Sequence, residues 1–193
     1  SRIHHFDGKS AEAVELAREA LRYAESAELP AQSANAQCWL GFLLTNTEPR
    51  REVEGLDLLQ RSASNARAIG DRYQMNESTL NMGNVQLSLG DFPGALESFE
   101  ACLHYCQEMG ATSEEIFALL NLAAVLVEMG RAADALAYAD SAATLARAQG
   151  RAPATSDRGR RHRRGRSPAP LLRRLHQRLG HAPQLLGPSP AAH

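Results

Sequence analysis

The chain of 193 residues has few aromatic side chains and few cysteines. Aromatic residues make up 5% of the sequence, with a single Trp, and the apolar content of 44% comes mainly from Ala and Leu. Because these residues favour helix, the composition indicates an all-α core. The three cysteines, Cys38, Cys102 and Cys106, show no spacing typical of a disulfide framework. We therefore expect a reducing, cytoplasmic environment.

Long apolar runs are also missing. No run reaches 18 residues, which excludes a transmembrane helix, and no signal peptide is visible. The two parts of the chain differ sharply in charge. Residues 1–150 hold 21 acidic and 11 basic residues, a net charge of −10, whereas residues 151–193 hold ten Arg and one acid, a net charge of +9. Such asymmetry indicates two physically distinct parts.

Groupings that would indicate catalysis or metal binding are absent as well. The stretch GNVQLSLGD (83–91) lacks the Gly-Lys-Ser/Thr ending of a phosphate loop, and no Ser/His/Asp grouping stands out. Cys102 and Cys106 share a helix face and could ligate a soft metal, but no CxxC pair accompanies them. Small residues occupy the equivalent positions forty residues away, so packing is the favoured role. We expect no enzyme activity, no metal and no cofactor.

A period of forty residues runs through the first 150 positions. The segment TLNMGNVQLSLGDFPGALESF (79–99) overlays LLNLAAVLVEMGRAADALAYA (119–139), and WLGFLLTNTEPRREVEGLDLL (39–59) fits more loosely at the same spacing. Each unit predicts two antiparallel helices joined by a turn of two or three residues. One half unit precedes them, because residues 6–29 overlay residues 88–111.

Local signals define where these helices begin and end. Thr112 and Glu115 form a capping-box pattern, and Asp91 followed by Pro93 predicts another helix start. Glycines suit the left-handed position that ends a helix. They recur at positions 70, 90, 110, 130 and 150.

Equivalent slots recur in the second helix of each unit. Gly55, Ala95 and Ala135 share one small slot, as do Ser62, Cys102 and Ala142, and a larger slot holds Leu59, Phe99 and the small exception Ala139. With Trp39, Phe42, Leu43, Met82, Gly83 and Gly90, this pattern resembles tetratricopeptide repeats in an extended form. It is similar to Leu-Gly-Asn repeat proteins, through Met82-Gly83-Asn84, and to helical sensor regions of bacterial signalling proteins. The resemblance implies an all-α, right-handed solenoid of helix pairs.

The resemblance divides the chain into five parts. These are a partial repeat of mainly one helix (1–30), three repeats (31–70, 71–110 and 111–150) and an Arg/Pro-rich tail (151–193), in which residues 170–180 could form a short helix. The tail is out of phase with the period. We expect this tail to be poorly ordered, and three interpretations stay open: a disordered basic tail that binds nucleic acid or an acidic surface, a cap on the acidic body, and a stretch read in the wrong frame.

The resemblance also implies a concave groove, lined by the first helices, that binds a peptide. Family positions facing this groove fall on Gln37, Leu40, Leu44, Glu77, Leu80, Asn81, Asn84, Ser88, Phe117, Leu120, Asn121, Ala124 and Glu128. Asn81 and Asn121 match the family asparagine that bonds a ligand backbone, although both could instead bond neighbouring helices. Leu40, Leu80 and Leu120 replace the lysine of members that clamp a C-terminal carboxylate, so a clamp of that kind is not expected.

The function expected from these features is an interaction module for a peptide or partner protein. It would form the sensory or scaffolding part of a larger bacterial signalling protein, with no membrane contact. A nucleic-acid-binding regulator acting through the Arg-rich tail is the alternative, and it ranks lower because the acidic body would repel phosphate.

Overall fold

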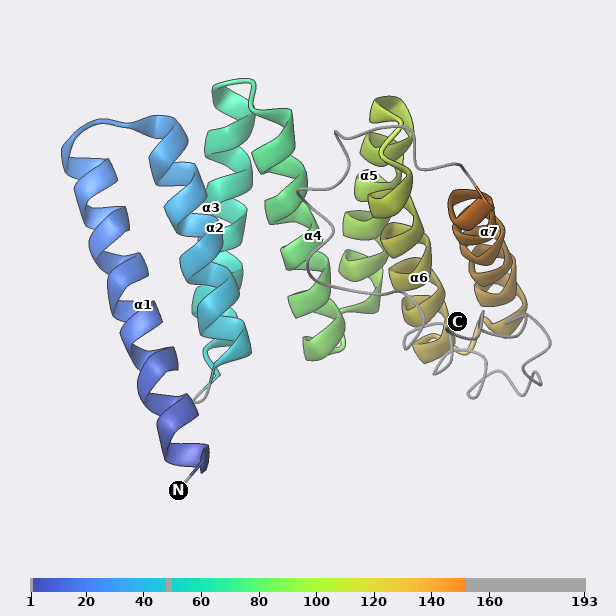
Figure 1. Cartoon of the computed structure of the whole chain (residues 1–193), viewed down its shortest axis with the longest axis horizontal. Helices are drawn as coiled ribbons and strands as arrows, with labels where there is room; N and C mark the ends of the chain where they lie inside the picture. The colour runs from blue at the N-terminus through green and yellow to red at the C-terminus, as the bar shows by residue number, and fades with distance from the viewer. Residues whose placement is uncertain (1, 48–49, 152–193) are drawn as a thin grey trace, which may run out of the picture. The chain divides into compact units, whose positions relative to one another are not determined.

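The computed structural model describes residues 2–47 and 50–151, and within them it contains helices and turns only (Figure 1). The helices are α1 (Arg2–Ser26), α2 (Pro30–Asn46), α3 (Glu52–Ala68), α4 (Arg72–Leu89), α5 (Phe92–Met109), α6 (Thr112–Glu128) and α7 (Ala132–Arg151). This architecture confirms the expectation of an all-α helical solenoid. The interpretations of the basic tail concern positions beyond 151, which lie outside the described residues.

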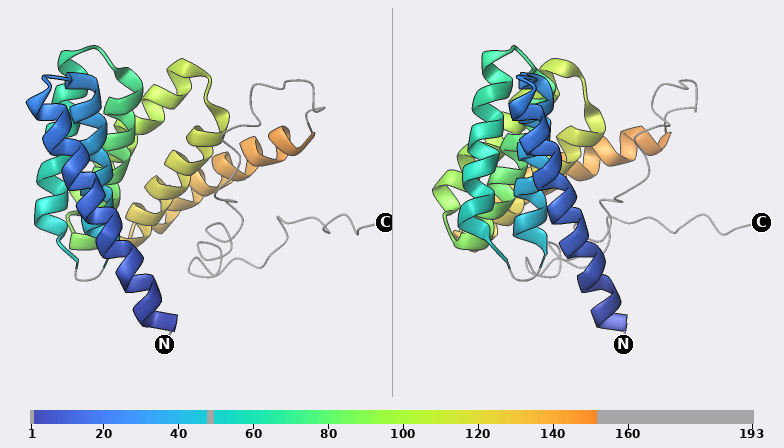
Figure 2. Two further views of the ribbon diagram at one scale, coloured as in Figure 1. Left: turned by 60° about the vertical axis from the view of Figure 1, so that its left-hand side comes forward. Right: turned by 90° about the vertical axis from the view of Figure 1, so that its left-hand side faces the viewer.

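The described residues divide into two compact units, one up to Cys102 and one from Leu103 onward. In the first unit α1, α2, α3 and α4 follow one another, each packed against the next, and α2 also contacts α4 (Figure 1). In the second unit α6 and α7 lie side by side as an antiparallel pair (Figure 2). Neighbouring helices therefore bury each other's apolar sides, as the repeat pattern predicts.

Glycines end the helices at four of the five expected positions. Gly70, Gly90, Gly110 and Gly130 have φ values between 63° and 79°, the left-handed region that glycine enters without strain. The fifth expectation is wrong, because Gly150 lies inside α7, which continues to Arg151.

One predicted helix start is confirmed and another is wrong. The Asp91 carboxylate accepts a hydrogen bond from the backbone N–H of Gly94 at 3.1 Å, as expected of an N-cap. The Thr112–Glu115 capping box does not form. Ala111 is the residue before α6, with no side-chain cap, and Thr112 is already helical, one position too late to cap it.

The recurring slots of the second helices form the centre of the packing. Leu59, Phe99 and Ala139 are all fully buried, and so are the small residues at the closest helix approaches. These small residues are Gly55, Ala95, Ala135, Ser62, Cys102 and Ala142. The equivalences read from the period in the second helices are therefore confirmed.

A buried polar network joins three helices of the first unit. The Ser62 and Ser78 hydroxyls lie 2.7 Å apart, and each has a backbone carbonyl within reach, that of Ala34 at 2.6 Å from Ser62 and that of Gln74 at 2.9 Å from Ser78. Each hydroxyl carries one proton, so one serine donates to the other and the second donates to its carbonyl. Both hydroxyls are fully buried, so these hydrogen bonds replace the water that each group loses on folding.

An ion pair connects α1 to α3 at the surface. The Arg18 guanidinium donates to the Glu54 carboxylate at 2.9 Å, and Arg51 also pairs with Glu54. Partial desolvation acts to raise the pKa of Glu54, but the Arg18 hydrogen bond and the charges of Arg51 and Arg18 outweigh it. The pKa of Glu54 therefore lies below its usual value.

Candidate functional site

The register of the first helices decides which of their residues face outward. Gly41 of α2 and Gly83 of α4 are at equivalent positions: Gly41 lies where α2 crosses α3, and Gly83 lies where α4 crosses α5. A Cβ at Gly41 would lie 2.9 Å from Leu59, and a Cβ at Gly83 would lie 2.7 Å from the Phe99 ring. Leu59 and Phe99 are forty residues apart, but the two glycines are 42 apart. The first helix of the first repeat is thus displaced by two positions.

The displacement comes from the connection between α2 and α3. Residues 47–51 separate these helices, whereas only residues 90–91 separate α4 from α5. The expected turn of two or three residues is therefore wrong for the first pair. A longer connection costs little free energy, so the fold tolerates it although it shifts the sequence period.

The three residues of α2 assigned to the groove are buried by this displacement. Gln37, Leu40 and Leu44 are exposed by 3%, 2% and 1%. Leu40 and Leu44 pack in a core cluster with Val14, and the Gln37 side chain accepts a hydrogen bond from Asn65 of α3 at 2.9 Å. Leu40 and Leu44 thus face the core and not a groove, whereas Gln37 lines the polar hollow described below.

An offset of 42 identifies the outward residues of α2 instead. They are Asn35, Trp39, Phe42 and Asn46, of which Phe42 is half-buried and the others are exposed. The Trp39 side chain is 58% exposed, and its ring stands edge-on to the Phe42 ring at 6.1 Å. Sequence reasoning missed this row, although the shared glycine in WLG (39–41) and NMG (81–83) was a usable signal.

The α4 residues assigned to the groove lie on the equivalent outward side. Glu77, Leu80 and Asn81 are half-buried, and Asn84 and Ser88 are exposed. The Asn81 amide donates to the Cys38 sulfur of α2 at 3.6 Å. Asn81 thus makes the contact between neighbouring helices that was the alternative to ligand binding, while Asn84 remains the more accessible amide.

The α6 residues belong to the second unit. Phe117, Asn121 and Ala124 are half-buried, and Glu128 is exposed. Leu120 is fully buried, so it serves the core and cannot contact a partner. The remaining four keep the spacing of one helix side, which is compatible with a surface for binding.

The cysteines contribute to packing, and the described residues contain no group of three or more metal-ligating side chains. Cys102 donates to the Asn76 carbonyl at 3.7 Å. Burial raises the pKa of Cys38 and outweighs the hydrogen bonds from Ser78, Asn81 and Gln74 that act to lower it. A buried thiol with a raised pKa stays protonated, and a protonated thiol is a poor nucleophile.

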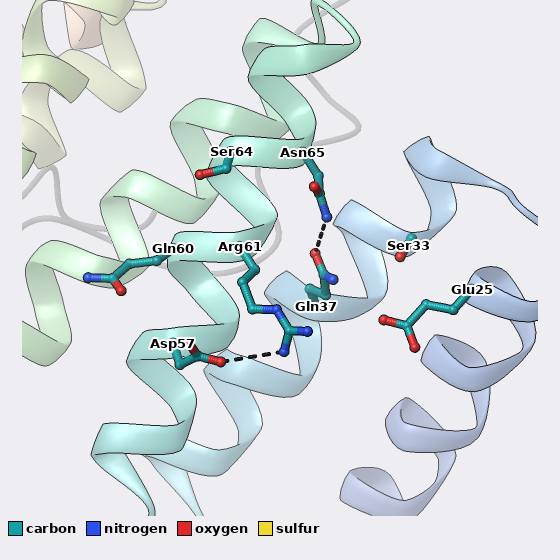
Figure 3. A pocket seen from close by; sticks show the side chains of 8 residues that line it. All are labelled: Glu25, Ser33, Gln37, Asp57, Gln60, Arg61, Ser64 and Asn65. Carbon is teal, nitrogen blue, oxygen red and sulfur yellow. Dashed lines mark hydrogen bonds and ion pairs between the residues drawn. The ribbon is translucent and has the colours of Figure 1, made fainter.

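A polar hollow of about 500 Å³ lies elsewhere in the first unit, among α1, α2 and α3 (Figure 3). It is lined by Glu25, Ser33, Gln37, Asp57, Gln60, Arg61, Ser64 and Asn65. Arg61 pairs with Asp57 at 3.5 Å, and Asn65 bonds Gln37. The lining lacks apolar side chains, so it differs from the mostly apolar sites that bind small organic ligands.

Comparison with known proteins agrees with the geometry. Residues 74–148 match the family model of the tetratricopeptide repeat. A search of curated proteins finds no significant match. Among the described residues, no helix combines the length and apolar character needed to cross a membrane. The match covers the part of the chain in which the forty-residue period is uniform, and it shows that residues 74–148 are similar to tetratricopeptide repeats.

Proposed function

We propose that the chain binds a peptide segment of a partner protein through the outward sides of α2 and α4 in the first unit, and that α6 offers a surface of the same kind within the second unit. Tetratricopeptide repeats generally serve as protein-interaction modules and are generally non-catalytic, so the similarity of residues 74–148 to these repeats supports a role in protein interaction. We further infer that the chain has a sensory or scaffolding role in a larger bacterial signalling protein of the cytoplasm.

The observation that carries this proposal is the row of outward side chains on α2 and α4. Asn35, Trp39 and Asn46 on α2, with Asn84 and Ser88 on α4, are exposed although they lie in the middle or last turns of well-packed helices. Amides can donate to and accept from a peptide backbone, and the exposed Trp39 ring, edge-on to the half-buried Phe42 ring, provides an apolar anchor. The Asn35 and Asn46 amides already donate to the Gln74 side chain and to the Phe42 carbonyl, so they offer a peptide their oxygens. On α6, Asn121 with Phe117 repeats the combination of amide and aromatic side chain.

A peptide-display selection on the full chain tests the proposal. Peptides enriched by the wild type are measured by fluorescence anisotropy against Asn84→Ala. Loss of one hydrogen bond of about 1 kcal/mol predicts a Kd about fivefold higher. Gln60→Ala is the matched control, because Gln60 is an exposed amide on α3, away from the row. Equal loss in both variants, or no enriched peptide, would refute the assigned surface.

The alternative function, nucleic-acid binding through the tail, is supported by the net charge of +9 in residues 151–193. Binding of this kind weakens steeply with salt, because each neutralised phosphate releases counterions. A gel shift that persists after truncation at residue 150 would exclude it.

A further inference from the structure

The polar hollow among α1, α2 and α3 contains two buried side chains that keep unused hydrogen-bonding groups. Ser33 and Gln37 of α2 line the hollow and are exposed by only 8% and 3%. Among the described residues, the Ser33 hydroxyl has no hydrogen-bond partner, and the Gln37 amide uses only its oxygen, which accepts from Asn65. Buried polar groups normally have partners, so the open Ser33 hydroxyl and Gln37 N–H groups indicate a polar ligand.

Opposite charges face each other across the same hollow. The Glu25 carboxylate of α1 and the Arg61 guanidinium of α3 point toward one another, with Gln37 between them (Figure 3). Within the described part of the chain, Glu25 forms no ion pair with Arg61 or with any other residue. Arg61 bonds Asp57 through Nη1 at 3.5 Å, and its guanidinium carries further N–H donors. A ligand could therefore meet a carboxylate on one side and guanidinium donors on the other.

The walls of the hollow are held together within the first unit. α1 packs on α2, and α2 packs on α3. The ion pair of Arg18 with Glu54, at 2.9 Å, also joins α1 directly to α3. The hollow measures about 500 Å³, whereas a water molecule takes up about 30 Å³ of the liquid. It is therefore a preformed space with room for a small organic molecule.

The repeat fold does not itself require these polar side chains. At the offset of 42 that relates α2 to α4, Gln37 corresponds to Thr79, whose hydroxyl is already bonded to the Met75 carbonyl. At the offset of forty that relates α3 to α5, Arg61 corresponds to Ala101. The next repeat thus forms the same helices without the open amide and without the cation. Helix packing alone does not account for the polar set of the hollow.

The lining defines the class of ligand. It has no apolar side chain to receive a hydrophobic molecule and no aromatic ring on which a base would stack. A ligand that uses the open groups needs a cationic donor near Glu25 and Ser33. It also needs an anionic acceptor near Gln37 and Arg61. A free α-amino acid carries an ammonium and a carboxylate on the same carbon, so it meets both needs at once.

We propose that this hollow is a binding site for a free α-amino acid. The ligand's ammonium donates to Glu25 and to the Ser33 hydroxyl, and its carboxylate accepts from Gln37 and Arg61. Hydrogen bonds between charged groups are the stronger kind, which offsets the exposure of Glu25 and Arg61. The site is separate from the peptide surface proposed above, because it lies among α1, α2 and α3 and not on the outward sides of α2 and α4.

Thermal unfolding of the full chain in the presence of each proteinogenic L-amino acid tests the proposal. A ligand that binds only the folded protein raises Tm as its concentration increases. The amino acid that raises Tm most is then measured by isothermal titration calorimetry. Its N-acetyl and carboxamide derivatives each lack one of the two charges. Each should bind about tenfold more weakly, because one charge-assisted hydrogen bond is lost.

Substitutions in the lining locate the site. Glu25→Gln and Arg61→Gln should each raise the Kd about tenfold. Glu19→Gln and Arg67→Gln are the matched controls, because both residues are exposed on the same helices and lie outside the lining. Ser33→Ala should raise the Kd about fivefold, through the loss of one neutral hydrogen bond. It should leave the free energy of unfolding unchanged or higher, because the hydroxyl has no partner in the described chain.

The outcomes that overturn the proposal are distinct from those that refute the peptide surface. No rise of Tm with any amino acid, or equal binding by the N-acetyl and carboxamide derivatives, excludes the ligand class. Equal binding by Glu25→Gln and Glu19→Gln excludes the hollow. Binding that Asn84→Ala weakens and Glu25→Gln does not would place the amino acid on the peptide surface, and the proposal would again be wrong.

Discussion

The close approach of α2 to α3 at Gly41 leads to a prediction with a definite sign. A Cβ added at Gly41 would lie 2.8 Å from the backbone oxygen of Gly55 and 2.9 Å from Cγ of Leu59. The backbone of α3 cannot move aside locally, so the two helices must separate. Overpacking of this kind costs about 1–3 kcal/mol.

Helix propensity acts in the opposite direction. Ala is better than Gly in a helix interior by about 1 kcal/mol. The packing cost should exceed this gain, so we expect Gly41→Ala to lower the free energy of unfolding by about 1–2 kcal/mol. For a chain of this size the fall in Tm is about 2–8 °C.

Denaturant unfolding followed by circular dichroism and by Trp39 fluorescence measures this loss. Trp39 lies two positions from Gly41, so it reports on the affected helix pair. Ser64→Ala is the control, because it improves helix propensity at an exposed position of α3 without a clash. A Gly41→Ala protein as stable as the wild type, or more stable, would show that α2 and α3 are not packed as described.

Three further predictions concern the first unit. Phe99→Ala removes a fully buried ring and should lower the free energy of unfolding by about 3–5 kcal/mol, measured by urea denaturation. Glu54→Gln should reduce the stability difference between neutral and acid pH; because the folded pKa is lowered from 4.5, its contribution is complete above pH 4.5 and is lost as pH falls through the folded pKa. A matching loss in Arg18→Ala would support the ion pair, and an unchanged pH profile would contradict it. Cys38 should resist thiol labelling at pH 8 until denaturant is added, because burial raises its pKa, and rapid labelling of the native protein would contradict this.

The sequence predicted the second helices of the repeats better than the first. Leu59 and Phe99 occupy the same slot at a spacing of forty, and both are fully buried as expected. Each slot of the second helices accepts only a residue of the right size, because it is buried between helices, so the pattern of large and small residues can be read in the sequence. Glycines with positive φ were equally predictable, since few other residues adopt that conformation.

The outward residues of α2 could not be assigned by the same reasoning. A longer loop after α2 shifted the phase by two residues, and a shift of two turns a helix by about 200°. Gln37, Leu40 and Leu44, which were expected in the groove, are therefore buried, whereas Trp39 is exposed. The length of a loop changes the free energy of folding only slightly, so the spacing of residues alone did not reveal the displacement of α2. The capping box at Thr112 was also wrong, because α6 begins one residue earlier and Thr112 lies inside it; sequence patterns place a helix end only to within one or two residues.

The buried hydroxyl pair of Ser62 and Ser78 has a consequence for the order of the repeats during folding. Helix pairs of similar shape can stack out of order, a common failure of repeat proteins. If α3 docked on α6 in place of α4, Ser62 would face Ala118, the counterpart of Ser78, and lose a hydrogen bond worth about 1 kcal/mol. Cys102 and Ala142 hold the place of Ser62 in the other repeats, so the hydroxyl pair marks one junction. A slipped stack therefore leaves a mismatch at that junction, which disfavours it relative to the native order.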